Sequence, residues 1–522
     1  MRNMPLEETS VKDSSTGKKL RGQVTIEAGT KITRAQDVFP GGTFLMSTVL
    51  LGMLGFAVTA AEVLGVLTAI HAIMGARTSQ GAIAWALSLV MFPIISLPLY
   101  WVLGRNKFRG YADSRRVGAL QIQRVVQEAG QRAQADGLLR QPETHNHQVF
   151  ERLAKMPFTH HNRVDLLING QAVFQAIFEG IGAAQDYILV QFFIVQDDAL
   201  GRELKAKLLQ KAAQGVRIYF LYDEIGSHSL PRAYIRELIQ AGVQIRPFYT
   251  TKGFRNRFQI NFRNHRKIVV VDGRLAYVGG LNVGDEYMGR NSRIGPWRDT
   301  HVRIAGPAVH AVQLSFIEDW YWATREVPPL DWNPRPAEGG RYNVLVLPTG
   351  PADELETCSL FFVQAINAAR HRVWIASPYF VPDPQVICAL QLAAMRGVDV
   401  RIVLPNNPDH LLVYLSGFSF LEETEEVGVK IYRYQPGFMH HKVILVDDDL
   451  AAVGTANLDN RSFRLNFEIT ILVNDRDFAE DVWKMFERDF AECELAKPED
   501  LARKSFWFKV AVRIARLMAP IQ

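Results

Sequence analysis

Two long uncharged stretches stand out near the start of the chain. Residues 38–76 contain a single Asp, Glu, Lys or Arg side chain, that of Glu62, and residues 78–104 contain none. Each stretch is long enough for the roughly 20 residues of a membrane-spanning helix. The pattern predicts a hairpin of two transmembrane helices over residues 43–104, in which Glu62 leaves the register of the first helix open. Two buried helices of a soluble core are the alternative.

Basic residues are concentrated outside this hairpin. The turn between its two helices contains only Arg77, whereas both flanks are rich in lysine and arginine. Those flanking residues are Arg2, Lys12, Lys18, Lys19, Arg21, Lys31 and Arg34 before the hairpin, and Arg105, Lys107, Arg109, Arg115 and Arg116 after it. Because positive charge accumulates on the cytoplasmic side of membrane helices, we expect both ends of the hairpin, and everything after residue 104, to be cytoplasmic.

Three segments complete the outer parts of the chain. Residues 1–42 are polar without an apolar period, which predicts an N-terminal arm, and they lack the early apolar run of a signal peptide. Residues 105–145 form a basic, helical connector. Residues 504–522 predict a basic amphipathic C-terminal helix. That helix has two interpretations: it lies in the plane of an anionic membrane, or it packs its apolar face on the protein body.

Between these segments, apolar runs alternate with amphipathic stretches in an order that occurs twice. The alternation is typical of an α/β fold with buried strands. The first series comprises residues 187–195, 203–214, 216–221 and 243–248, and the second comprises residues 373–381, 385–396, 400–404 and 429–434. A period of roughly 180 residues indicates a duplicated domain. The Pro- and Gly-rich residues 331–342 are the natural boundary, so we expect one domain over 146–335 and another over 336–503.

Composition narrows the class of protein. A chain of 522 residues is long enough for about three domains. Its three cysteines are widely separated and form no Cys-x-x-Cys pair, so the sequence predicts neither a disulfide framework nor a zinc knuckle. The formal charge of +5 is too small for this length to indicate nucleic-acid binding.

Each copy carries the same polar motif near its end. The motif reads His-x-Lys-x-x-x-x-Asp, and an asparagine follows seventeen residues after the histidine in both copies. The residues are His265, Lys267, Asp272 and Asn282 in the first copy, and His440, Lys442, Asp447 and Asn457 in the second. One such match can arise by chance, but two at equivalent places in a repeat cannot.

These residue types suit chemistry on a phosphodiester. Side chains alternate along a strand, so the histidine and lysine of each motif point to one face. Two copies facing each other across a pseudo-twofold axis then combine two imidazoles, two ammonium groups and two amides. One imidazole can attack phosphorus, the other can protonate the departing alkoxide, and the lysines and asparagines can hold the phosphate oxygens. The two histidines must differ in protonation and titrate as a pair. No metal is needed.

The paired motif resembles the duplicated HKD signature of the phospholipase D superfamily. From residue 43 to its end, the chain resembles the bacterial cardiolipin synthases of that superfamily. Further similar stretches are GGLNVGDEYMG (279–289), PWRDTHVRI (296–304), SPYFVPD (377–383) and NLDNRSFRLNFE (457–468). One departure is Gly280, where many relatives have serine, so a hydroxyl contact to phosphate is not expected there.

The resemblance implies a fold and an activity. The fold is two phospholipase D-like α/β/α sandwich domains related by pseudo-twofold symmetry, preceded by the transmembrane hairpin. The activity is that of a phosphatidyltransferase that condenses two phosphatidylglycerol molecules into cardiolipin and glycerol through a phosphohistidine intermediate. Neither a cofactor nor a metal is implied. The expected partners are phosphatidylglycerol and anionic lipids of the bacterial cytoplasmic (inner) membrane, without nucleic acid. The oligomeric state, the acyl preference and the use of phosphatidylethanolamine stay open.

The resemblance also implies individual roles. His265 is the nucleophile and His440 the acid and later the base, although the sequence alone does not distinguish the two. Asp299 and Glu468 resemble the residues that orient the histidines. The alternatives in function are a lipid hydrolase, a phosphatidyltransferase with another acceptor, a superfamily nuclease and, from another class, a non-enzymatic membrane scaffold.

Several residues have a purely structural interpretation as well. Asp272 and Asp447 are equally well explained as hairpin-turn residues. For Asn282 and Asn457 helix capping is the alternative, and the phosphate role is favoured because both follow a Gly-containing bend. His441 fails the motif spacing and is expected to be structural. The pairs His145 with His147 and His160 with His161 are more typical of surface loops than of a metal site. A cluster of Arg255, Arg257 and Arg263 around aromatic residues fits either lipid headgroups or a solvated surface.

Overall fold

The computed structural model describes residues 41–76, 78–104, 107–141, 144–249, 261–407, 409–497 and 503–522. Nearly all of the arm expected for residues 1–42, together with Arg255 and Arg257, lies outside the described residues. The chain divides into two compact units, Met1–Ala60 and Ala61–Gln522. Both copies of the repeat belong to the second unit.

The predicted membrane hairpin is supported only in its first helix. Helix α1 spans Gly41–Gly75, and its residues Thr48–Gly75 are long and apolar enough to cross a membrane. The second uncharged stretch is divided into α2 (Ser79–Met91) and α3 (Pro93–Leu103). Pro93 has no N–H to continue α2, and Phe92 before it leaves the helical conformation with φ −134° and ψ 56°. Neither short helix has the length of a span, so the multi-pass prediction has no support in the described residues.

The connector is helical and joins the body of the protein. It forms α4 (Arg109–Ala135), and α5 (His145–Ala154) follows it. Helix α4 packs on α9 (Ala308–Thr324), where the Tyr111 hydroxyl donates to Asp319 Oδ1 at 2.6 Å.

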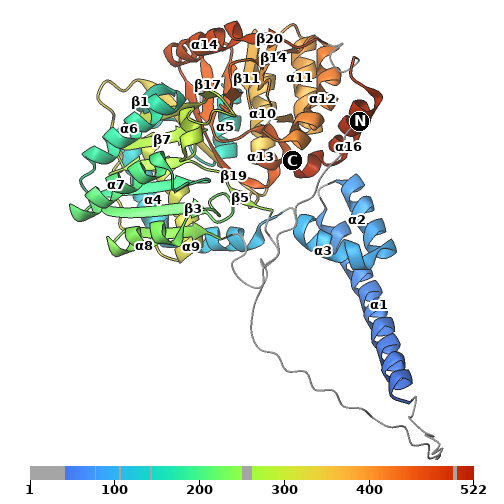
Figure 1. Ribbon diagram of the computed structural model, residues 1–522. Coiled ribbons are helices and arrows are strands. Elements are labelled where there is room, and N and C mark those ends of the chain that lie inside the picture. The colour runs from blue at the N-terminus through green and yellow to red at the C-terminus, as the bar shows by residue number, and fades with distance from the viewer. Residues whose placement is uncertain are drawn as a thin grey trace, which may run out of the picture. The chain divides into compact units, whose positions relative to one another are not determined.

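A single mixed sheet runs through both copies of the repeat (Figure 1). In the first copy its main strands are β1 (Thr159–Ile168), β2 (Tyr187–Phe192), β3 (Arg217–Asp223), β4 (Gln244–Phe248), β6 (Ile268–Val271), β7 (Leu275–Gly279) and β9 (Thr300–Ala305). In the second they are β10 (Tyr342–Thr349), β11 (Arg372–Ala376), β13 (Asp399–Pro405), β14 (Lys430–Tyr434), β16 (Val443–Val446), β17 (Leu450–Gly454), β19 (Asn466–Asn474) and the edge strand β20 (Cys493–Leu495).

The strand order makes the pseudo-twofold symmetry visible. Strands β1 and β10 pair antiparallel at the centre, with Thr159 opposite Val344. Outward from β1 the order is β9-β7-β6-β2-β3-β4, and outward from β10 it is β19-β17-β16-β11-β13-β14. Apart from the edge strand β20, which pairs with β14, each strand in this order has its equivalent at the same distance from the centre. The duplicated α/β architecture is confirmed.

Helices cover both faces of this sheet. On one face α9 and α14 (Arg476–Ala491) share a continuous apolar core with α4 and with strands of both copies. On the other face the first copy carries α6 (Asn169–Ala183), α7 (Ala199–Ala213) and α8 (Arg232–Gln240). The second carries α10 (Thr357–Ala368), α11 (Pro384–Met395) and α12 (Leu411–Glu425), next to α5 and the C-terminal helix α16 (Phe506–Leu517). The shared core makes the two copies one folded body.

The aspartate of each motif lies in a tight turn between two neighbouring strands. Asp272 connects β6 to β7 and Asp447 connects β16 to β17, with φ 52° and 50°. Aspartate tolerates this left-handed conformation better than most residues. The Asp272 carboxylate accepts hydrogen bonds at 2.8 Å from the backbone N–H groups of residues 185–187. That of Asp447 accepts from residues 370–372 at 2.7–3.2 Å. These contacts favour the hairpin-turn interpretation.

Replacing Asp447 by alanine should therefore lower stability rather than chemistry. The substitution removes the acceptor of three backbone N–H groups and adds strain at φ 50°, which should cost about 1–2 kcal/mol. We expect a lower thermal unfolding midpoint in detergent, with the activity per folded molecule retained. The matched control is Asp448→Ala, because Asp448 is 71% exposed and forms only a surface ion pair. An unchanged midpoint with lost activity would instead assign Asp447 to the reaction.

Candidate active site

Each motif histidine is paired with a carboxylate from the other copy. His265 Nδ1 lies 2.9 Å from Glu468 Oε2, and His440 Nδ1 lies 2.9 Å from Asp299 Oδ2. Both carboxylates are completely buried, and both histidine side chains are 10% exposed. The structure thus brings the four residues together, in a crossed arrangement that their spacing in the sequence does not reveal.

Two short strand pairs produce this crossing. Just before His265, β5 (Arg263–Asn264) pairs in parallel with the start of β19, so that Asn264 is opposite Phe467. Just before His440, β15 (Phe438–Met439) pairs in parallel with β8 (Trp297–Arg298). The backbone of each histidine segment is therefore attached to the segment that carries its carboxylate.

The carboxylates determine the tautomer of the histidines. A carboxylate only accepts hydrogen bonds, so Nδ1 of each ring carries the hydrogen and Nε2 keeps its lone pair. Burial lowers the pKa of His265 to about 4 against the opposing charge of Glu468. Burial and then the charge of Lys442 lower the pKa of His440 to about 4. At these pKa values both rings are neutral at pH 7.

Both carboxylates stay charged despite their burial. Burial alone would raise the pKa of Asp299, but the hydrogen bond from His440 and the charge of Lys442 hold it below its usual range. Burial would also raise the pKa of Glu468, but the interactions with His265 and Lys267 outweigh this effect and lower that pKa.

The two lysines lie beside their histidines. Lys267 is fully buried, and its Nζ donates to the backbone oxygen of His265 at 2.7 Å. Lys442 Nζ donates to the backbone oxygen of His440 and lies 2.9 Å from its Nδ1. Because that Nδ1 already donates to Asp299, the second contact is electrostatic. Burial lowers the pKa of Lys267 well below its usual value and that of Lys442 to about 8.

The asparagines make local contacts and do not cap helices. Asn282 Oδ1 accepts from the Ile194 N–H at 3.1 Å. Asn457 Nδ2 donates to Asp459 at 3.2 Å, and its buried Oδ1 has no hydrogen-bond partner among the described residues. Asp459, not Asn457, is the N-cap of α13 (Asn460–Arg464). A phosphate-binding role for both amides stays a prediction.

The two histidine–carboxylate dyads, His265 with Glu468 and His440 with Asp299, differ in their surroundings. Glu468 also accepts from Thr455 Oγ1 at 2.6 Å, from Ser462 Oγ at 2.9 Å and from Asn466 at 3.2 Å. Around Asp299, a Cβ on Gly280 would lie 2.1 Å from the carboxylate oxygen Oδ1. A side chain at that position would require the Asp299 carboxylate to shift.

Sequence reasoning missed two buried ion pairs behind the dyads. Arg266 Nη1 lies 2.9 Å from Asp319 of α9, and its Nε donates to the backbone oxygen of Glu468 at 3.0 Å. In the other copy Arg298 makes two hydrogen bonds of 2.8 Å to Asp489 of α14. The alternation of side chains along a strand could have predicted these two arginines. A residue next to a motif residue points to the opposite face, which helices cover.

The remaining candidate residues from the sequence lie outside the two histidine–carboxylate pairs. The carboxylates of Asp272 and Asp447 are engaged at their turns, and His441 is buried with its Nδ1 3.2 Å from Thr300 Oγ1, a structural position. The remaining candidate histidines, His145, His147, His160 and His161, form no metal site: no group of three His, Cys, Asp or Glu residues in the described part of the chain could hold a metal ion.

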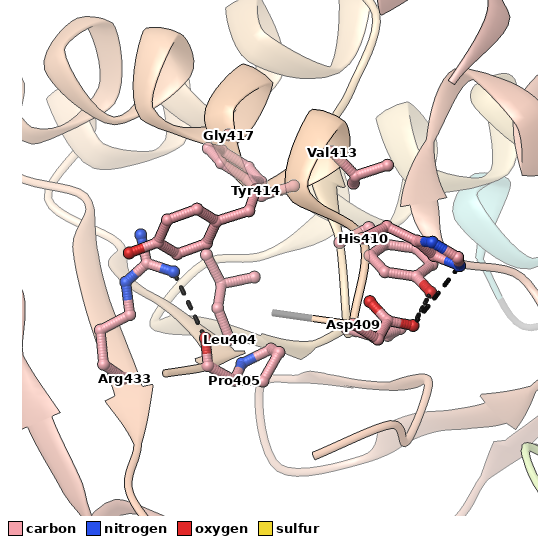
Figure 2. A pocket seen from close by; sticks show the side chains of 11 residues that line it. Leu404, Pro405, Asp409, His410, Val413, Tyr414, Gly417 and Arg433 are labelled. Carbon is pink, nitrogen blue, oxygen red and sulfur yellow. Dashed lines mark hydrogen bonds and ion pairs between the residues drawn. The ribbon is translucent and has the colours of Figure 1, made fainter. Parts of the chain in front are cut away.

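A small pocket lies next to the site in the second copy (Figure 2). Asp409 and His410 are on one side of it, and Arg433 is on the other. Its wall includes Phe380, whose strand β12 (Phe380–Val381) pairs with Leu458, the neighbour of Asn457. With a volume of about 30 Å³, it has room for no more than one or two waters.

Comparisons with known proteins agree with this geometry. The family model described as "Cardiolipin synthase, PLD-like domain" matches residues 177–314 and 362–490, and the model "Phospholipase D-nuclease N-terminal" matches residues 63–105. Cardiolipin synthase A of Pseudomonas aeruginosa (strain LESB58) is 51% identical over 90% of this chain and 96% of its own length. That of Pseudomonas fluorescens (strain Pf-5) is 49% identical over 90% of this chain and 98% of its own.

The fold has a relative among solved structures. The phosphatidylserine synthase of Haemophilus influenzae Rd KW20 superposes with a TM-score of 0.53, covering 72% of this chain and all of its own, at 14% identity. That likeness concerns the fold alone. With the matched family model, the relatives at about half identity and the apolar helix α1, the chain is a membrane-associated member of the cardiolipin synthase family within the phospholipase D superfamily.

Proposed function

We propose that this protein is a phosphatidyltransferase that converts two phosphatidylglycerol molecules into cardiolipin and glycerol. The observation that carries the proposal is the crossed pair of histidine–carboxylate dyads, with a buried lysine beside each histidine. The relatives named above are cardiolipin synthases, which supports this substrate among the lipids that the chemistry allows.

In the first half-reaction, Nε2 of His265 attacks the phosphorus of one phosphatidylglycerol. A phosphorus–nitrogen bond forms and the bond to the glycerol headgroup breaks. His440, protonated at this stage, gives its Nε2 proton to the departing glycerol oxygen. Lys267, Lys442, Asn282 and Asn457 stabilise the charge on the phosphate oxygens.

In the second half-reaction, the neutral His440 removes the proton from the terminal hydroxyl of another phosphatidylglycerol. The resulting oxygen attacks phosphorus, the phosphorus–nitrogen bond breaks, and cardiolipin leaves. The proton that His440 gained replaces the one it donated, so the enzyme returns to its starting state.

The unequal dyads support this assignment of roles. The Glu468 carboxylate accepts from three donors besides His265, whereas the Asp299 carboxylate accepts from two besides His440, the Thr300 backbone N–H at 2.8 Å and the Trp297 indole N–H at 3.4 Å. A less shared carboxylate stabilises an imidazolium more strongly. Lys442 opposes protonation of His440 until the bound phosphodiester neutralises its charge.

We further propose the domain bounds 146–335 and 336–503 and a cytoplasmic position for both domains at the bacterial inner membrane. The run of basic residues directly after the apolar stretches, Arg105, Lys107, Arg109, Arg115 and Arg116, supports this position.

The roles of the histidines can be tested by trapping the intermediate. His440→Ala should slow resolution of a phosphatidyl adduct on His265, and His265→Ala should form none, because each histidine acts at a different step. Mass spectrometry of acid-free quenched mixtures locates the adduct. His441→Ala is the matched control, since that ring is buried on the opposite side. An adduct on His440 in the His265→Ala protein would reverse the assignment.

The pH dependence should have an alkaline limb set by Lys442. Its folded-state pKa is lowered to about 8, so the ammonium loses its proton as the pH rises through that value and kcat/KM falls. Lys442→Arg should lower the rate at neutral pH but move the fall upward, because a guanidinium stays protonated. Lys484→Arg, at an exposed position, should leave the profile unchanged. If the limb stays in place in Lys442→Arg, Lys442 does not set it.

The product mixture tests the proposed activity itself. Positioning of an acceptor can contribute roughly 7–11 kcal/mol, enough to favour a lipid hydroxyl over water. Radiolabelled phosphatidylglycerol should give cardiolipin and glycerol in near-equal amounts with little phosphatidic acid. Added glycerol should reverse the reaction, since one phosphodiester replaces another. The variant His265→Ala, which lacks the proposed nucleophile, is the inactive control. Phosphatidic acid as the main product, without reversal, would identify a lipid hydrolase.

A further inference from the structure

The C-terminal helix α16 has one face packed on the protein body. Val512 and Ala515 are buried, and the Phe508 ring lies 5.4 Å from that of Phe418 on α12. Arg513 and Arg516 form ion pairs with α12 at 3.2 and 2.5 Å. Of the two interpretations of this segment, packing on the body therefore describes this face.

A second apolar face of the same helix has no such cover. Trp507, Ile514 and Leu517, at helical spacing, are 76%, 59% and 78% exposed, and the preceding Phe506 is 70% exposed. We call these four residues the C-terminal stripe. Exposing this much apolar surface in water is unfavourable, so contiguous patches of this kind mark an interaction site.

The charge around the stripe indicates the kind of partner. Residues 503–522 contain Arg503, Lys504, Lys509, Arg513 and Arg516 and no acidic residue. An aromatic and aliphatic face bordered by basic side chains is the composition of helices that lie at the surface of anionic bilayers. A partner protein would need a matching apolar surface, whereas a bilayer of anionic lipid meets both requirements at once.

Helix α12 lies between the stripe and the small pocket of the second copy. Its Phe418 contacts α16, while Val413, Tyr414 and Gly417 line that pocket. At the start of α12, Leu411 is also exposed, at 68%. A membrane held at the stripe is therefore on the side of the second copy that carries α12.

We propose that the C-terminal stripe inserts into the surface of an anionic lipid bilayer and docks the catalytic body there. This contact is separate from the tether that α1 provides. It is proposed as a binding surface and does not depend on cardiolipin synthesis, because docking is measured without turnover. A second copy of this chain is the competing occupant, which the experiment distinguishes.

Spin labels on the full-length protein test the docking directly. In a Cys388→Ser, Cys493→Ser background, a nitroxide is attached at Ile514→Cys, and the protein is placed in lipid nanodiscs of phosphatidylcholine with phosphatidylglycerol. The matched control is Met395→Cys on α11, where the side chain is 72% exposed. The lipid anchor α1 is present in both proteins, so loss of docking is not confused with loss of attachment.

The expected result is a label at Ile514 that collides readily with oxygen, which dissolves in lipid, and is protected several-fold from a water-soluble nickel complex relative to the Met395 label. Protection should weaken in discs of phosphatidylcholine alone. Equal exposure of both labels to the nickel complex would overturn the proposal. Protection from both reagents that persists in detergent and increases with protein concentration would assign the stripe to a second copy and equally overturn it.

A second measurement relates docking to catalysis and rests on the proposed function. Ile514→Glu with Leu517→Glu should lower turnover of bilayer phosphatidylglycerol roughly tenfold, but not turnover of a monomeric short-chain analogue. Met395→Glu should affect neither. Equal turnover of the bilayer substrate by the double variant and the wild type would contradict docking during catalysis. If the wild type turned over neither substrate, the proposed function would fail while the spin-label result still decided docking.

Discussion

The crossed hydrogen bonds between His265 and Glu468 and between His440 and Asp299 are the interactions on which the rest of the site depends. Each histidine needs a carboxylate to fix its tautomer, and each copy supplies that carboxylate to the other. Neither copy therefore contains a complete half-site. The central pairing of β1 with β10, and the pairings of β5 with β19 and β8 with β15, hold the partners in place. Duplication is thus a chemical requirement as well as an architectural one.

Burying so many charges has a cost that the surrounding structure must offset. An isolated buried carboxylate would become neutral, and an isolated buried ammonium would lose its proton. The pairs Arg266 with Asp319 and Arg298 with Asp489 supply charge from the helices behind the sheet and bond to the backbone of the dyads. Asp319 also accepts from Tyr111 of the connector, so the segment that follows the apolar helices is joined to the same network.

The sequence predicted the elements and residue types of the site, and side-chain alternation explains why His265 and Lys267 fall together. It did not predict the crossing, because the period of a strand determines the face of a residue but not its partner. Asp272 shares its motif with the histidine and yet folds into a turn, since the four residues of β6 lie between Lys267 and Asp272. Pro93 indicates the break between α2 and α3, because a proline can end one helix and begin another. A count of uncharged residues does not reveal this break.

The near-symmetry of the site and the asymmetry of its reaction are compatible because the reaction exchanges one phosphodiester for another. In the proposed mechanism, the histidine that protonates glycerol must later deprotonate the incoming lipid, so it acts once as an acid and once as a base. A symmetric scaffold supplies two such rings at equal burial, and the contacts of Thr455 in one copy and Gly280 in the other then make the carboxylates unequal. Small differences around the carboxylates, rather than in the histidines themselves, support the two proposed roles.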